Sequence, residues 1–115
     1  MAITDSILDT IKSMLPGVVN TDAFDTELII HINTVLNTLK QLGVGPSDGF
    51  MIDNPDATWA DFLEDEQQLQ QVKSYMYLRV RLLFDPPNSS TVLESFKEQI
   101  KEFEWRMNVE VETDW

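Results

Sequence analysis

The eight residues from Phe84 to Thr91 constrain the fold more than any other segment, because they end one helix and begin another. Asp85 and Pro86 each precede a proline, and a residue before proline is disfavoured in the α-helical conformation. A helix that precedes this segment must therefore end near Phe84. Thr91-x-x-Glu94 matches a capping box, in which both side chains bind free backbone N–H groups of the first helical turn. The sequence thus predicts two helices joined by a rigid corner, over residues 66–84 and 92–108.

The predicted helix over 92–108 carries a narrow apolar seam. Its apolar side chains recur at alternating three- and four-residue steps, the heptad spacing of a helix that packs along one partner. Beyond it, Val109 to Glu112 alternate with a period of two, which indicates a frayed tail or an added strand. We predict a flexible tail over residues 109–115. The seam consists of Leu93, Phe96, Ile100, Phe103 and Met107.

Two short helices are predicted in the first part of the chain. Residues 5–15 carry apolar side chains at helical spacing, and Pro16-Gly17 follows as a stop signal. Thr58-x-x-Asp61 resembles a capping box with Asp in place of Glu. It predicts a short helix over residues 59–64.

The clearest helical pattern lies between these two, over residues 25–42. Apolar side chains at three- and four-residue steps mark one wide face of this helix. Asp25 is placed as its N-cap, and Gly43 is placed to end it in a left-handed conformation.

A long irregular loop follows, over residues 43–57. Three Gly and two Pro break any helix here, while Phe50-Met51-Ile52 is apolar enough for a very short strand. A connection of this length in a compact domain is often functional or disordered. The apolar triplet indicates an ordered loop that docks either on the protein's own core or on a neighbouring molecule. We therefore predict an all-α fold, a small bundle of four to five helices in a single domain over residues 1–115.

The charge of the chain is strongly acidic and unevenly distributed. The net charge is −12, and the first 72 residues hold twelve Asp and Glu against Lys12 and Lys40 alone. Such a surface repels nucleic acid, because binding to phosphates requires cations. No segment has the length and apolarity of a membrane span, and the N-terminus lacks the pattern of a signal peptide. These features predict a soluble intracellular protein that binds neither DNA nor membrane.

Enzymatic chemistry finds little support in the sequence. There is no cysteine, only one histidine, His31, and no motif of a nucleophile elbow, a phosphate-binding loop or a zinc protease. Asp48, Asp53 and Asp56 lack the alternating spacing that directs several oxygens at one calcium ion. We predict no enzymatic activity, no cofactor and no metal site.

Candidate contact residues lie in three places. Phe50, Met51 and Ile52 come from the loop, and Trp105-Arg106 point away from the heptad seam. Trp and Arg are common interface anchors. Arg79 and Arg81 either face the acidic surface of a neighbour or form ordinary pairs within the chain.

An ordered set of motifs spans residues 58–110 and resembles the small head–tail connector proteins of long-tailed bacteriophages and prophages. These are also called adaptor, head-completion or DNA-packaging proteins. The resemblance is carried by Thr58-Trp59-x-Asp61-Phe62-Leu63, Val72-Lys73-x-Tyr75-x-Tyr77-Leu78, Arg81-Leu82-Leu83-Phe84-Asp85-Pro86-Pro87 and Glu104-Trp105-Arg106-Met107-Asn108.

The resemblance implies a structural virion protein that is made in the host cytoplasm and acts at the head–tail interface. It implies a homo-oligomeric ring, dodecameric to match the portal, that docks beneath the portal protein after DNA packaging. A tail-side connector or stopper protein attaches to the other side, and DNA passes through the channel without specific binding. The alternatives from the residues are an acidic inhibitor that mimics DNA and a generic helical interaction module.

Overall fold

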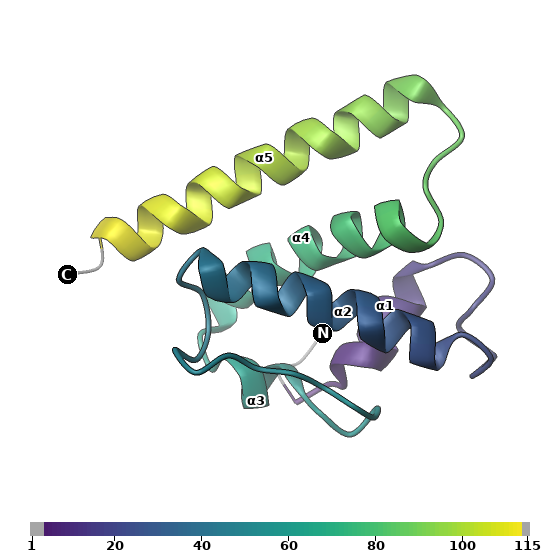
Figure 1. Cartoon of the computed structure of the whole chain (residues 1–115), viewed down its shortest axis with the longest axis horizontal. Coiled ribbons are helices and arrows are strands. Elements are labelled where there is room, and N and C mark those ends of the chain that lie inside the picture. The colour runs from purple at the N-terminus through teal and green to yellow at the C-terminus, as the bar shows by residue number, and fades with distance from the viewer. Residues whose placement is uncertain (1–3, 114–115) are drawn as a thin grey trace.

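The computed structural model describes residues 4–113. Within that range the chain forms five helices and no strand, and the only β pairing is an isolated bridge between Ser6 and Thr58 (Figure 1). The predicted all-α bundle is confirmed. The helices are α1 (Ile7–Met14), α2 (Asp25–Gln41), α3 (Trp59–Phe62), α4 (Glu66–Phe84) and α5 (Ser90–Thr113).

Helix α4 is the centre of the bundle, since it packs against α1, α2 and α5. Its inner face is buried, and Tyr75 and Met76 have no exposed surface. Trp59 of α3 is also wholly buried, and its indole Nε1 donates a 3.0 Å hydrogen bond to Thr10 Oγ1 of α1. A buried Trp thus gains both apolar packing and a partner for its polar atom.

Helix α5 lies along α4, and its C-terminal end extends past the other helices (Figure 1). Ile100 and Met107 of the predicted seam are buried, while Phe96 and Phe103 are partly buried against the same core. The helix continues to Thr113, so the flexible tail predicted from residue 109 is helical over most of its length. The packed turn at Met107 supplies a helical end from which the chain propagates, and this outweighs the weak period-two pattern. Asp114 and Trp115, also part of the predicted tail, lie outside the described residues.

At the corner between α4 and α5, helix α4 ends where predicted, but helix α5 begins earlier than predicted. Helix α4 stops at Phe84, whose ring packs edge-on against Phe24 with ring centroids 5.5 Å apart. The capping box predicted at Thr91 is wrong, because α5 begins at Ser90 and Ser89 Oγ accepts a 3.3 Å hydrogen bond from the Val92 N–H. Three neighbouring hydroxyl residues can each cap a helix, and the sequence alone does not choose among them.

The N-terminal caps of the first helices differ in the same way. Ser6 caps α1, accepting a hydrogen bond from the Asp9 N–H. Asp25, predicted as a cap, is instead the first residue of α2 and forms a 2.9 Å ion pair with Lys12 of α1. An acidic side chain in the first turn still favours the helix dipole, and here it also joins two helices. The capping box at Thr58 is confirmed.

The loop over residues 43–57 is ordered and docks on the protein's own core. It contains no strand; instead Asn33 of α2 clamps Ile52, donating to its carbonyl at 2.9 Å and accepting from its N–H at 2.8 Å. Ile52 is buried, and Phe50 packs against Phe62 with centroids 5.6 Å apart. Gly45 permits this close approach, because its φ is +90° and a Cβ there would lie 2.4 Å from the Phe62 ring.

Candidate interaction surfaces

A groove of about 770 Å³ lies between the outer face of α2 and the docked loop. Two apolar side chains on it are exposed, Ile30 by 59% and Met51 by 75%. Side chains of this kind seldom cluster at the surface unless another molecule covers them. We call this surface the α2–loop groove; it is lined by Ile30, Asn33, Thr34, Asn37, Lys40, Asp48, Gly49, Phe50 and Met51.

The rim of the α2–loop groove carries one charge of each sign. Lys40 and Asp48 form no ion pair among the residues whose side chains the structure describes. The stem of Lys40 lies against Gly49, where an added Cβ would be 3.3 Å from its Cδ. Because the stem packs on the backbone, the ammonium group is held at the edge of the groove.

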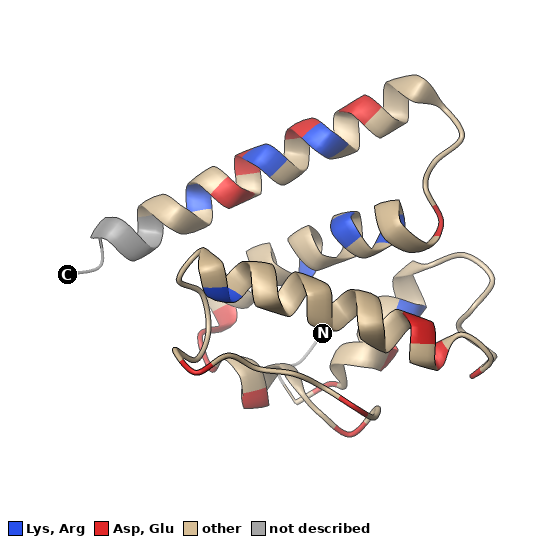
Figure 2. Ribbon diagram, viewed as in Figure 1, with Lys and Arg blue, Asp and Glu red and all other residues tan. Residues whose placement is uncertain are grey.

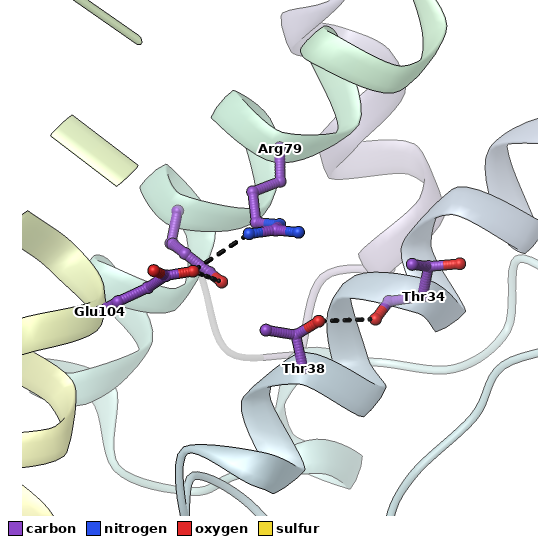
Figure 3. Close-up of polar contacts among 5 residues, drawn as sticks. Thr34, Thr38, Arg79 and Glu104 are labelled. Carbon is purple, nitrogen blue, oxygen red and sulfur yellow. Dashed lines mark hydrogen bonds and ion pairs between the residues drawn. The ribbon is translucent and has the colours of Figure 1, made fainter. Parts of the chain in front are cut away.

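A polar cluster joins α4 to α5 beside the apolar seam. The Tyr75 hydroxyl donates a 2.7 Å hydrogen bond to Glu104 Oε2, and Arg79 Nη1 lies 3.0 Å from the same oxygen. Figure 3 shows the guanidinium of Arg79 on α4 pointing toward Glu104 of α5. The Thr38 hydroxyl of α2 donates to the carbonyl of Thr34 in its own helix at 3.2 Å. Glu104 is the acid that fixes the Arg79 guanidinium.

The same cluster shifts the pKa of the Tyr75 side chain. Burial, and then the hydrogen bond to Glu104, raise the pKa of the Tyr75 phenol well above its ordinary value, although the Arg79 charge opposes this. Arg79 also lies over the Tyr75 ring, with its guanidinium carbon 5.7 Å from the centroid. These contacts hold α5 at one position along α4.

Arg81 braces the corner on the other side of α4. Its Nε donates a 2.8 Å hydrogen bond to the Asp85 carbonyl, and its Nη1 donates to the Tyr77 hydroxyl at 3.0 Å. The guanidinium also lies 5.9 Å from the Phe96 ring of α5. Two roles were considered for Arg79 and Arg81. In the structure, both residues form contacts within the chain.

Trp105 is the most exposed aromatic side chain of α5. It is 67% exposed, on the opposite side of the helix from the buried Met107. Arg106 forms an ion pair with Glu102 one turn earlier, and both side chains are more than half exposed. Lys101, also exposed, forms no ion pair among the side chains described. This part of α5 offers an aromatic anchor with charges on either side.

The fold therefore exposes some of the candidate contact residues and buries others. Met51 and Trp105 are exposed, Ile52 is buried, and Phe50 packs on the core. Sequence reasoning missed Ile30, which lines the groove with Met51. The signal was present, because Ile30 is an apolar residue that falls outside the apolar face of its own helix.

The described part of the chain holds no group of three His, Asp or Glu that could bind a metal ion. His31 is half-buried on α2. None of the helices within residues 4–113 combines the length and the apolarity that crossing a membrane requires.

The family model described as phage connector protein matches residues 7–114. The chain belongs to this family of bacteriophage connector proteins. It is a phage head–tail connector protein, with a structural role in the virion and contacts to other virion proteins. No curated protein and no solved structure matches the chain.

Proposed function

We propose that this protein assembles as a homo-oligomeric ring beneath the portal, with its single domain over residues 1–115 as the repeating unit. The ring completes the head after DNA packaging, offers an attachment point to a tail-side connector or stopper protein, and continues the path of the DNA. Twelve copies would match the portal. The role requires no catalysis and no cofactor.

The observation that carries this proposal is the separation of two unlike surfaces on one chain. Figure 2 shows basic and acidic residues alternating along α5, while α3 and the loops around it carry acidic residues alone. The three most exposed apolar residues also lie apart, with Ile30 and Met51 on the α2–loop groove and Trp105 on α5. A ring needs a heterologous interface, in which two different patches of one subunit meet, and this chain has two such patches.

The acidic surface suits the DNA path. Carboxylates displace no counterions from DNA and form no phosphate contacts, so a channel lined by them lets the duplex slide. The densest run, Glu64-Asp65-Glu66, is exposed at the start of α4. We propose that this run faces the channel.

Electron microscopy of the purified protein, alone and mixed with the portal protein, tests the proposal. Rings of one subunit type bound coaxially to the portal are expected. A protein that stays monomeric in both samples, and that leaves portal particles undecorated, would contradict it. The portal is included because weak ring contacts gain from a template that raises the local subunit concentration.

A further inference from the structure

Two of the exposed apolar features of this chain match each other in form. The α2–loop groove is a recess with Ile30 and Met51 open to solvent. Trp105 is an aromatic side chain that projects from α5 and is 67% exposed. Large aromatic side chains bury roughly 150–250 Å² when they enter such a recess.

We infer that the α2–loop groove of one subunit receives Trp105 of a second copy of this chain. This inference rests on the proposed ring and names the two surfaces that meet in it. A groove of about 770 Å³ has room for an indole ring together with parts of the flanking side chains.

The charges around the two surfaces are complementary. The groove carries Lys40 and Asp48 on its rim, neither of them paired among the described side chains. Trp105 is preceded by Glu102 three positions earlier and by Lys101 four positions earlier, both on its own side of α5. Asp48 can therefore face Lys101, while Lys40 faces Glu102, whose carboxylate also pairs with Arg106 of its own helix. Paired charges at the rim set the register of an interface more than its affinity.

The positions of the surfaces favour contact between copies. Figure 1 places α5 and the loop beneath α2 on opposite sides of the molecule, with the C-terminal end of α5 projecting beyond the bundle. A projecting helix and a groove on opposite sides of one chain produce a head-to-tail contact, which closes into a ring or extends as a filament.

The absence of cysteine makes a direct test simple. The exposed residues Asn37 in the groove and Lys101 beside Trp105 are each replaced singly, as Asn37→Cys and Lys101→Cys, so that both Ile30–Met51 and Trp105 stay intact. The two variants, one carrying a size tag, are mixed with the portal and oxidised. A heterodisulfide between the tagged and untagged chains is expected. Val92→Cys replaces Lys101→Cys in the control, since Val92 is 41% exposed at the other end of α5.

A second variant tests the anchor itself. Trp105→Ala is expected to weaken ring formation by about 30-fold or more, as is typical of a buried interface Trp. Val92→Ala should leave assembly unchanged. Because both side chains are exposed, circular dichroism and thermal unfolding of the monomers should match the native chain.

The outcomes separate this inference from the proposed function. Rings that form without the Asn37–Lys101 heterodisulfide, or that form equally well with Trp105→Ala, overturn the inference. They leave the proposed ring function unaffected. A loss of portal binding by Trp105→Ala in rings that still assemble also overturns it, because Trp105 would then contact the portal. Failure of the native chain to assemble under any condition contradicts both.

Discussion

The Tyr75 hydroxyl donates a 2.7 Å hydrogen bond to Glu104, and this contact joins the central helix α4 to α5. Arg79 binds the same carboxylate oxygen at 3.0 Å. One acid therefore satisfies two donors from α4, and its removal leaves both without a partner. A polar group left unpaired away from water costs about 1–3 kcal/mol.

Glu104→Ala should lower the free energy of unfolding by about 1–3 kcal/mol, through the unpaired Tyr75 hydroxyl and Arg79 guanidinium. Urea unfolding followed by circular dichroism measures this change. Glu98→Ala, at an exposed position of the same helix, is the matched control and should change stability by less than about 0.5 kcal/mol. Equal effects of the two substitutions would show that the cluster does not stabilise the fold.

The raised pKa of Tyr75 predicts a loss of stability in alkaline solution. The folded state favours the neutral phenol, so its contribution is complete below the ordinary phenol pKa of about 10 and is lost as the pH rises toward the folded value. The free energy of unfolding should therefore fall with increasing pH above about 10. Tyr75→Phe removes the titrating group and should flatten this part of the profile. An unchanged slope in that variant would mean that other groups cause the alkaline loss.

The clamp between Asn33 and Ile52 should be needed for both folding and assembly. Asn33→Ala removes both hydrogen bonds to the Ile52 backbone and should cost about 1–3 kcal/mol in thermal or urea unfolding. Met51→Ser changes only an exposed side chain of the same loop, so it should spare stability and weaken assembly.

A deletion of Phe50-Met51-Ile52 does not separate assembly from folding, because Ile52 is part of the buried core. If Met51→Ser assembles like the native chain, as judged by sedimentation with the portal, the loop takes no part in the interface.

Charge reversal in the exposed acidic run should slow the passage of DNA. Glu64→Lys with Glu66→Lys creates cations that bind phosphates, while Asp65 is kept because its carboxylate accepts hydrogen bonds from Gln67 and Gln68 at the start of α4. Rings should still form, and DNA ejection from assembled particles should slow. The neutral pair Glu64→Gln with Glu66→Gln is the control. Ejection at the native rate from the Lys variant would place the run away from the channel.

Pro87→Gly should disturb assembly more than it destabilises the monomer. The substitution raises the entropy of the unfolded chain and costs about 1 kcal/mol of stability. It also frees the corner that sets the direction of α5, and the contacts of the proposed ring depend on that direction. Thermal unfolding of the monomer and electron microscopy of the assembly measure the two effects. Proportionate losses in both would show that the corner serves the fold alone.

The sequence predicted the fold where its signals are local. The end of α4 at Phe84 follows from two adjacent prolines, and the capping box at Thr58 follows from two side chains three residues apart. It did not predict which hydroxyl caps α5, because Ser89, Ser90 and Thr91 are equivalent as local signals.

The surfaces were harder to predict because they depend on contacts between distant residues. Asn33 and Ile52 are 19 residues apart, and their pairing decides that Ile52 points inward while its neighbour Met51 points outward. Likewise Arg79 pairs with an acid 25 residues away on another helix. No periodicity within one helix contains this information. The exposure of Trp105, by contrast, follows from its position opposite the seam of its own helix.

The braced corner between α4 and α5 has a consequence for the closure of a ring. Each subunit of a cyclic assembly turns the next by the same angle, so an error of a few degrees at one corner is repeated at every step around the circle. A flexible corner would yield open spirals or rings of mixed size. Two prolines, the Arg81 contacts to Asp85 and Tyr77, and the shared carboxylate of Glu104 remove that freedom before any neighbour arrives. In the proposed ring, contacts inside each subunit therefore help to determine the number of subunits.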